Sequence, residues 1–375
     1  FNERSLFALY FFPTKDCIAA YLGALRNNHV VLLIDPNLNE DLKDSLLDKF
    51  SIENIFNGEK WIKRKLYNHC EYSIHADLSV LLSTSGSTGS PKLIKITNTN
   101  LDSNANSIVQ YMKLKSTDRG ISSLPLHYSY GLSILNTHLA IGATFYLTNL
   151  PITDKDFWTF FKKNEITGLG GVPTTWRILR KLFFDRMKLP SLRLITQAGG
   201  KLNKEEIMWL AETGEKNEYQ VFIMYGQTEA TARISYLEPK MIKIKCGSIG
   251  KAIPGGKLLL KDEKNNVIKK ANKEGELIYK GNNIMMGYAS CISDLALGKE
   301  LKELETGDLA FKDKDDYFWI TGRKKRFIKV FGNRFSLDDI EGYLYSQGIE
   351  SSVIGKDDKL VIVINKKIKL NKEQL

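Results

Sequence analysis

The sequence has few cysteines and no long apolar run. Four cysteines occur in 375 residues, with no Cys-x-x-Cys pair and no histidine at metal-ligand spacing. This pattern argues against a disulfide framework or a zinc site and favours a reducing compartment, so we expect a cytoplasmic protein. The apolar stretches are short, such as Val30–Ile34, well below the roughly 20 residues of a membrane-spanning helix. We therefore expect no membrane span, and no targeting signal is visible after Phe1.

No internal repeat or low-complexity linker stands out. Hydrophobic residues make up 43% and charged residues 26% of the chain, ordinary globular values that argue against disorder or a fibrous repeat. The length suggests two or three domains. The net charge of +11 would permit a polyanionic partner, but the basic residues are spread along the chain. Because neither zinc-finger spacing nor an aromatic RNA-binding strand is present, we expect no nucleic-acid partner.

Predicted strands and helices alternate along most of the chain. Apolar runs predict strands over residues 6–12, 30–34, 78–83, 93–97, 140–147, 194–197 and 221–224, and amphipathic patterns predict helices over 15–27 and 102–112. From Gly275 onward the pattern changes to short strands with Gly and Asp turns, typical of antiparallel β-structure. The prediction is an α/β fold: a large N-terminal domain of helix-flanked β-sheets with a β-rich subdomain, then a small α+β domain after a boundary near residues 321–325.

The strongest local signal is the run STSGSTGSPK at residues 83–92. It offers hydroxyls, backbone N–H groups on glycines and the ammonium of Lys92, which are the groups that a polyphosphate needs. It is not a Walker A loop, because Pro91 stands where that motif has Gly and a strand pattern follows in place of a helix. Taken alone, the run is also compatible with an ordinary Ser/Gly hairpin.

Two further segments follow predicted strands. Tyr225 at a strand end could stack on a flat heterocycle, Thr228 offers a hydroxyl to a phosphate, and Glu229 offers a hard oxygen ligand for Mg²⁺. Gly199 and Gly200 would let the backbone approach a ligand closely. Taken singly, each segment is equally compatible with a structural turn.

Two residues nearer the C-terminus suit a ribose. The carboxylate of Asp308 could accept hydrogen bonds from both ribose hydroxyls. The planar fork of Arg323 could bridge ribose or phosphate. As an isolated turn residue, Asp308 would more often be structural.

The order and spacing of the motifs carry a resemblance to a known family. The runs STSGSTGSPK, LPLHYSYGLS, GGVPTTW, QAGG, YGQTE, GELIYKG with MMGY, TGDLAF and GRKKRFIKVFG follow one another from about Phe7 to Val363. Together they closely resemble the adenylate-forming (AMP-binding) superfamily of acyl-CoA synthetases, peptide-synthetase adenylation domains and beetle luciferase. The resemblance implies an acid–thiol ligase that uses ATP and Mg²⁺ to convert a small-molecule carboxylic acid to an acyl-adenylate with release of pyrophosphate. The acyl group would then pass to the thiol of CoA or of phosphopantetheine on an acyl or peptidyl carrier protein.

The resemblance also implies roles for the matched residues. Glu229 would bind Mg²⁺ and Thr228 would contact the α-phosphate, with Lys92 and His127 completing the catalytic set. The residues that would hold the nucleotide are Thr84, Ser85, Gly86, Ser87, Thr88 and Gly89 at the β- and γ-phosphates, Gly199 and Gly200 at the border of the adenine and acyl pockets, Tyr225 and Gly226 at the adenine, and Asp308 and Arg323 at the ribose.

The run LPLHYSYGL matches the segment where the family places a histidine or aromatic residue at the entry of the carboxylate. Amino-acid-activating members commonly carry Asp there, whereas Tyr128 fills that place here and its flanks carry no acid. This favours a carboxylic acid without an α-amino group. Val172, Pro173 and Trp176 would line the acyl pocket, although an aromatic residue in such a segment is as often part of the core. A purely structural role for His127 is equally compatible with the sequence.

Lys325 falls at the family's hinge, between a large domain of residues 1–322 and a small domain of residues 323–375. Leu93 replaces the Gly that usually follows Pro-Lys. The family's adenylation lysine lies near the end of the small domain, and no matching Gly-Lys motif precedes Leu375. We therefore expect an incomplete small domain, in a chain trimmed at both ends or in a compact relative. Two hypotheses follow: an acid–thiol ligase, or a catalytically weak ATP- or AMP-binding relative.

Overall fold

The chain divides into two compact units in the computed structural model, which describes residues 3–65, 72–83, 92–324, 326–330, 333–349, 351–356 and 359–364. The first unit comprises Phe1–Lys257 and Lys280–Leu304, and the second comprises Leu258–Tyr279 and Glu305–Leu375. The predicted boundary after residue 322 places residues 258–279 and 305–322 in the large domain. In the structure these residues belong to the second unit instead, and their strands pair with one another in one sheet. Lys325 lies outside the described residues, so its role as a hinge stays a prediction.

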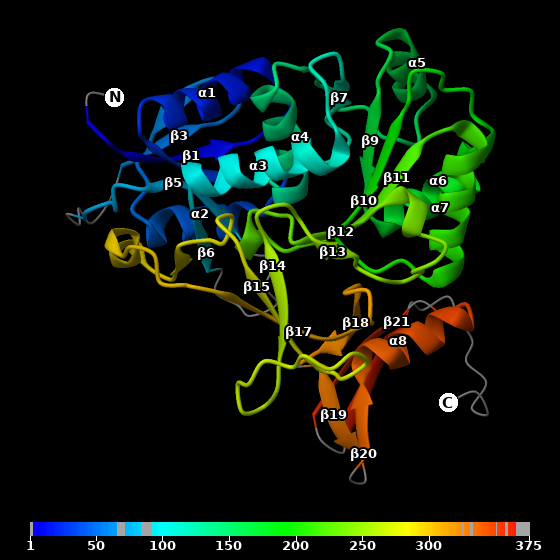
Figure 1. Ribbon diagram of the computed structural model, residues 1–375. Helices are drawn as coiled ribbons and strands as arrows, with labels where there is room; N and C mark the ends of the chain where they lie inside the picture. The colour runs from blue at the N-terminus through cyan, green and yellow to red at the C-terminus, as the bar shows by residue number, and fades with distance from the viewer. Residues whose placement is uncertain are drawn as a thin grey trace. The chain divides into compact units, whose positions relative to one another are not determined.

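Seven strands form the larger sheet of the first unit, in the order β16-β6-β5-β2-β1-β3-β4 (Figure 1). The central strands β5, β2, β1 and β3 are parallel, while β6 with β16 and, at the other edge, β4 join antiparallel. The strand bounds are β1 Leu6–Tyr10, β2 Val30–Ile34, β3 Asn54–Phe56, β4 Trp61–Lys63, β5 Leu78–Ser83, β6 Leu93–Thr97 and β16 Gly287–Ala289. The predicted strands at 30–34, 78–83 and 93–97 are confirmed.

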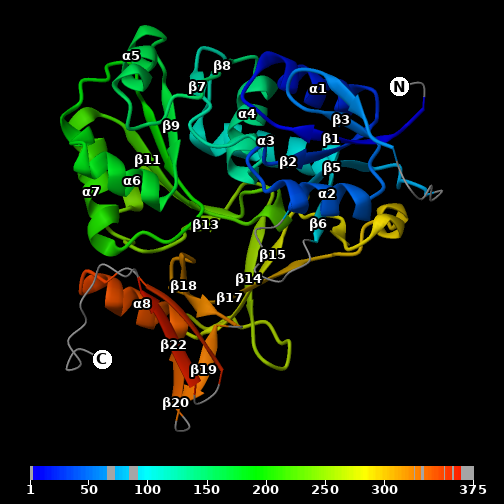
Figure 2. The ribbon, with the colours of Figure 1, turned by 180° about the vertical axis from the view of Figure 1, so that it is seen from behind.

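Alternate side chains of this sheet enter two separate cores. Phe7 and Leu9 of β1 face the core covered by α1 (Lys15–Arg26), α3 (Asn98–Met112) and α4 (Ser129–Ala140). Leu6 and Ala8 face the core covered by α2 (Glu40–Lys49) and the 3-10 helix η4 (Ile292–Ala296), on the opposite side of the sheet (Figures 1 and 2). Burial on both faces explains why the central strands β1 and β2 are apolar throughout, without a polar alternate position.

A second sheet in the first unit has the order β13-β12-β11-β10-β9. Its strands β9, β10 and β11 are parallel, and β12 and β13 continue antiparallel. Helices α6 and α7 pack against β9 and β11, respectively (Figure 1). The bounds are β9 Gly168–Gly171, β10 Leu194–Gln197, β11 Gln220–Tyr225, β12 Ser235–Leu237, β13 Lys251–Ala252, α5 Lys155–Lys163, α6 Pro173–Lys181, η1 Phe184–Arg186, α7 Lys204–Asn217, η2 Thr228–Ala230 and η3 Pro239–Met241.

Five predicted elements have other bounds in the structure. Strand β1 ends at Tyr10 and not at residue 12, helix α1 ends at Arg26 and not at residue 27, and strand β11 spans Gln220–Tyr225 and not residues 221–224. Helix α3 begins at Asn98 and not at residue 102, because the Thr97 hydroxyl accepts from the Asn100 N–H in a reciprocal capping box that starts the helix earlier. The strand predicted over 140–147 is wrong at its start, since α4 continues to Ala140. The chain then turns through Gly142, at φ 67°, before the short strand β8 (Thr144–Tyr146), which pairs with β7 (Arg119–Ile121).

The described residues of the second unit form a β-rich structure with one helix. A four-stranded sheet has the order β14-β15-β17-β18, and β17 and β18 are antiparallel as predicted for this region. Its small core gathers Leu337, Leu344, Ile349 and Val353 between α8 and β21. The bounds are β14 Lys257–Lys261, β15 Gly275–Lys280, β17 Leu304–Lys312, β18 Phe318–Arg323, β19 Phe327–Val330, β20 Asn333–Ser336, α8 Leu337–Ser346, β21 Ser351–Lys356 and β22 Lys359–Ile364.

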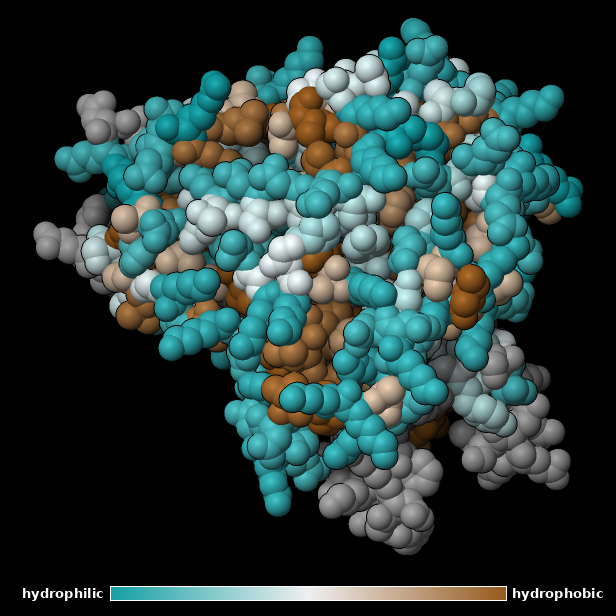
Figure 3. All heavy atoms as spheres, in the orientation of Figure 1, coloured by the Kyte–Doolittle hydropathy of each residue, from teal (hydrophilic) through white to brown (hydrophobic). Residues whose placement is uncertain are grey.

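The surface agrees with the composition. Figure 3 shows hydrophilic side chains over most of one face of the molecule, with apolar patches between them. No helix in the described part of the chain is long and apolar enough to cross a membrane. Cys17, Cys246 and Cys291 are free thiols, the first buried and the last exposed.

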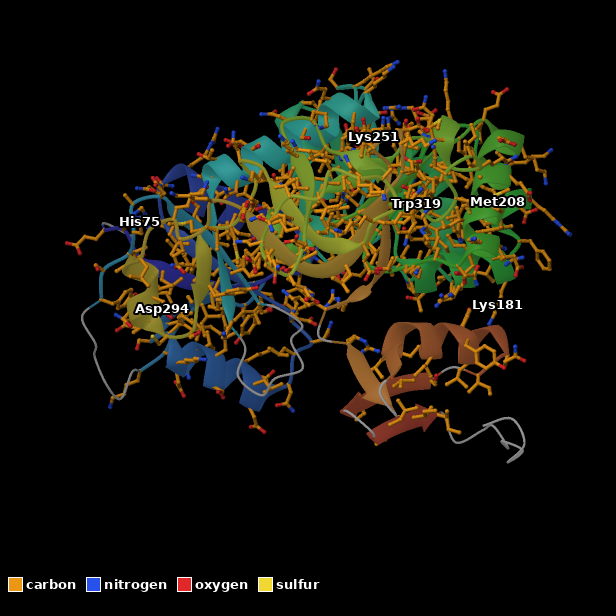
Figure 4. The ribbon with its side chains drawn as sticks, turned by 60° about the horizontal axis from the view of Figure 1, so that its bottom comes forward. His75, Lys181, Met208, Lys251, Asp294 and Trp319 are labelled. Atoms are coloured by element: carbon orange, nitrogen blue, oxygen red, sulfur yellow. The ribbon has the colours of Figure 1, made fainter. Side chains whose placement is uncertain are left out.

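Lys95 of β6 is a fully buried lysine whose three N–H donors are all used. Its Nζ donates to the carbonyl oxygens of Asp294 (3.0 Å) and Leu297 (3.1 Å) and to Glu300 Oε1 (2.8 Å). Figure 4 labels Asp294 in η4, the segment that this lysine ties to the sheet. Because Glu300 N also donates to Met286 O at 2.7 Å, the same contacts fix the approach to β16.

Replacing Lys95 with Met should lower the free energy of unfolding by about 1–3 kcal/mol, because Glu300 and the two carbonyl oxygens lose their donor while the volume is kept. Urea unfolding followed by circular dichroism measures this. Lys162→Met, on the exposed face of α5, is the control and should change stability by less than about 0.5 kcal/mol. Equal effects of the two substitutions would contradict the role of Lys95.

Candidate active site

The loop after β11 is held by close backbone contacts. A Cβ added at Gly226 would lie 1.6 Å from the Ala232 carbonyl oxygen, so only glycine fits there. Asn283, which is buried, donates from Nδ2 to Ala230 O at 2.6 Å and Arg233 O at 2.8 Å. Thr231 Oγ1 donates in return to Asn283 O at 2.8 Å. These bonds fix the segment that carries Thr228 and Glu229.

Glu229 and Lys92 meet around an aromatic ring from β16. Tyr288 Oη donates to Glu229 Oε1 at 2.8 Å, and Lys92 Nζ lies 5.7 Å from the centroid of the same ring. Partial burial, and then the charge and hydrogen bond of Glu229, raise the pKa of Tyr288, so its phenol stays protonated and donates. Tyr288 belongs to the MMGY motif but has no predicted role; the aromatic residue after the glycine of this motif was the available signal. Two predicted catalytic residues are thus neighbours.

Thr228 lies at the N-terminus of α4. Its Oγ1 is 3.2 Å from Ser129 Oγ, the first residue of the helix. The unpaired N–H groups and the dipole of a helix N-terminus favour negative charge nearby. A phosphate beside Thr228 would therefore be stabilised by the helix as well as by the hydroxyl. This geometry agrees with the predicted contact between Thr228 and the α-phosphate.

The predicted acyl-pocket residues also come together. Gly199 has φ 78° and is so close to Tyr128 and Val172 that an added Cβ would lie 2.7 Å from Tyr128 Oη and 3.1 Å from Val172 Cγ1. A Cβ at Gly200 would lie 2.9 Å from Pro173 Cγ. Both glycines are exposed, whereas the flanking side chains are half-buried. The arrangement leaves bare backbone facing an aromatic and aliphatic wall, which suits the acyl part of a small acid.

Trp176 differs from the other predicted pocket residues. It is only 2% exposed, packs edge-on against Phe184 at 6.1 Å and covers Gly171, where an added Cβ would meet its ring at 2.8 Å. These are contacts of a core residue, one of the two alternatives that the sequence left open. A role in the acyl pocket stays a prediction.

His127 stands just before α4 and carries an unpaired ring nitrogen. Its Nδ1 is buried without a hydrogen-bond partner in the structure, and its Nε2 lies 3.6 Å from Asp35 Oδ2. Burial lowers the pKa of His127, against the opposing effect of Asp35. Near pH 7 the imidazole is therefore neutral. An unpaired buried nitrogen is expected to meet a polar ligand group, and this favours a binding role over a purely structural one.

Asp308 and Arg323 pair with each other in the second unit. They face each other across β17 and β18, with Arg323 Nε 3.2 Å from Asp308 Oδ1. The Asp308 side chain is 7% exposed and that of Arg323 is 67% exposed. The structure therefore brings together the two residues predicted at the ribose, while the contact with a ribose itself stays a prediction.

Tyr225 ends β11 and is half-buried. Its carbonyl oxygen accepts from Ile234 N at 3.0 Å, which closes the loop that begins at Gly226. The predicted phosphate-loop residues Thr84, Ser85, Gly86, Ser87, Thr88 and Gly89 lie outside the described residues. The strands on either side, β5 and β6, are antiparallel, with Ser83 opposite Leu93, so a strand and not a helix follows this loop, as predicted.

No group of three or more His, Cys, Asp or Glu side chains that could hold a metal is found among the described residues. That Glu229 holds a cation stays a prediction. A single carboxylate fits Mg²⁺, which is usually bound by one or two carboxylates together with water and substrate phosphates.

Comparisons with known proteins agree with this geometry. The model of a family described as AMP-binding enzyme matches residues 42–289. Oxalate–CoA ligase of Arabidopsis thaliana is 30% identical over 302 residues, covering 77% of this chain and 56% of that protein. A 2-succinylbenzoate–CoA ligase of Bacillus subtilis is 29% identical over 284 residues, covering 75% of this chain and 56% of that protein. The chain thus spans a little over half the length of these curated relatives.

Solved structures show the same fold. The o-succinylbenzoate CoA synthetase of Bacillus subtilis with its acyl-adenylate intermediate has a TM-score of 0.81 at 22% identity, covering 98% of this chain and 79% of that chain. The same synthetase with ATP and magnesium has a TM-score of 0.78 at 22% identity, covering 96% and 78%. The predicted α/β architecture is confirmed.

Proposed function

Because the chain belongs to the AMP-binding enzyme family, we propose that it activates a small carboxylic acid with ATP and transfers the acyl group to a thiol. The observation that carries the proposal is the grouping of Thr228 and Glu229 with Ser129 and Tyr288, beside the bare backbone of Gly199. One oxygen ligand for a cation, one phosphate-binding helix end and one apolar wall are what an attack on a nucleotide phosphate needs.

In the first step a carboxylate oxygen would attack the α-phosphorus of ATP. A carbon–oxygen–phosphorus linkage forms, the bond to the β-phosphate breaks, and pyrophosphate leaves with its electron pair. Glu229 would hold Mg²⁺, which neutralises phosphate charge when bound. Thr228 and the N-terminus of α4 would orient the α-phosphate, and Lys92 would bind the departing phosphates. Tyr225 and Gly226 would border the adenine, and Asp308 with Arg323 would serve the ribose.

In the second step a thiolate would attack the acyl carbon and displace AMP. We propose CoA as the acceptor, since the relatives at 29–30% identity are named CoA ligases. Phosphopantetheine on a carrier protein presents the same thiol chemistry and is the alternative. Lys325 would act as the hinge between the two steps.

Pyrophosphate release by the full-length protein, with ATP, Mg²⁺ and a panel of small carboxylates, tests the proposal. We expect release with some acids, none without acid, and a thioester by mass spectrometry once CoA is added. If ATP binds but no acid promotes release above the blank, the protein is a nucleotide-binding relative and the proposal is overturned.

A further inference from the structure

Arg233 is a buried arginine without an acidic partner. It is 3% exposed, and its guanidinium carbon lies 4.1 Å from the centroid of the Tyr130 ring. Its Nε has no hydrogen-bond partner, and no carboxylate of the described ranges lies within 4.0 Å of the guanidinium. A buried charge left unpaired is strongly unfavourable, so such a group is expected to meet an anion.

The groups around Arg233 do not neutralise it. Its positive charge opposes the effect of burial on the phenol pKa of Tyr111, Tyr128 and Tyr130. Burial nevertheless keeps all three pKa values raised, and the phenols are neutral near pH 7. Asp118 lines the same cavity but is already bound by Arg193 through both of its carboxylate oxygens.

Arg233 lines a cavity between helices α3 and α4 and strands β9 and β10. The space along its lining residues measures about 470 Å³, part of which is open solvent. Its walls combine the hydroxyl residues Ser133, Thr137 and Thr196 with apolar residues such as Ile134. A buried cation on the wall of a partly apolar cavity describes a site for an organic anion.

The cavity is within reach of the proposed reaction centre. Ser129 lies next to Thr228, and Ser133 on the cavity wall follows Ser129 by four residues of the same helix, a rise of about 6 Å. Tyr128, which faces Gly199, is also close, since its ring centroid lies 6.4 Å from that of Tyr130. The cavity wall therefore begins about one helical turn from the residue that contacts Thr228.

We propose that the acid activated by this protein carries a second carboxylate, which pairs with Arg233 in this cavity. The proposal rests on the proposed function, since it assumes that the first carboxylate reacts beside Thr228. An acid with a single carboxylate would fill the same space and leave the guanidinium unpaired. Specificity then follows from the cost of that unpaired charge.

Matched pairs of acids test the proposal: glutarate against pentanoate, and phthalate against 2-methylbenzoate. With the full-length protein, kcat/KM for pyrophosphate release should be at least about tenfold higher for the diacid of one pair. In Arg233→Met that preference should fall by about tenfold or more, and Arg233→Lys should restore part of it. The ratio within a pair is the readout, so a general loss of activity does not imitate the result.

Arg180→Met is the matched control, because Arg180 lies on α6 in an exposed pair with Glu205. It should leave the ratio unchanged. Calorimetric titration of glutarate into each variant gives a second readout, in which only Arg233→Met should lose binding. Equal rates for both members of every pair, or an unchanged ratio in Arg233→Met, would overturn the second-carboxylate site while leaving the ligase intact. If no acid supports release in any variant, the ligase proposal fails first.

Discussion

Replacing Glu229 with Gln should lower acid-dependent pyrophosphate release about a hundredfold, the effect of removing one group that stabilises transition-state charge. The amide keeps the volume of the side chain but not its negative charge. It would hold Mg²⁺ more weakly, and the described residues offer no cluster of acids that could replace it. Raising the Mg²⁺ concentration should therefore restore part of the rate. A Mg²⁺ titration of the initial rate, with the parent protein alongside, measures this.

Tyr288→Phe distinguishes the effect of the Glu229 charge from the effect of the hydrogen bond that Glu229 accepts. The substitution leaves Glu229 charged and removes the donor at 2.8 Å, so we expect a rate loss of no more than about tenfold. Glu165→Gln, an exposed residue paired with Arg119, should have no effect. A near-parental rate in Glu229→Gln, or a loss as large in Glu165→Gln, would refute the assignment of Glu229.

Individual strands and helices were predictable because the pattern of apolar and polar residues within each segment indicates them. The fully apolar run Val30–Ile34 predicts a buried strand, and its bounds are confirmed. The bounds of the strand predicted over Leu194–Gln197 are confirmed too, although Thr196 and Gln197 are polar. The grouping of Tyr128 with Gly199 was predictable only through the motifs, since the two residues are far apart in the chain. The contact of Thr228 with Ser129 was not predicted.

The missed features depend on contacts that no local pattern records. Tyr288 meets Glu229 because β16 adds to the edge of β6, far from it in sequence. Lys95 looks like an outward-facing strand lysine until the segment at residues 294–300 covers it. Arg233 is unusual only because it is buried without an acid, and burial is a tertiary property. The division into two units likewise follows from strand pairing and not from the change of pattern at Gly275.

Replacing Gly226 with Ala should abolish most of the activity and destabilise the first unit. The new methyl group would overlap the Ala232 carbonyl oxygen at 1.6 Å and the Ala232 carbonyl carbon at 2.7 Å, and both are backbone atoms that no side-chain rotation can move. The loop from Gly226 to Arg233 would have to shift, which separates Thr228 from Ser129. We expect a rate loss of about a hundredfold and a loss of about 2–4 kcal/mol in the free energy of unfolding.

Gly23→Ala makes the same chemical change where the opposite result is expected. Gly23 lies inside α1, and nothing lies within 4 Å of an added Cβ, so Ala should raise the free energy of unfolding by about 0.5–1 kcal/mol and leave the rate unchanged. Urea unfolding and pyrophosphate release are measured on both variants. If Gly226→Ala unfolds like the parent but has lost its activity, the loop has moved without a loss of packing, and positioning of Thr228 and Glu229 alone explains the defect. If Gly226→Ala keeps both stability and rate, the tight turn after β11 does not position the catalytic residues.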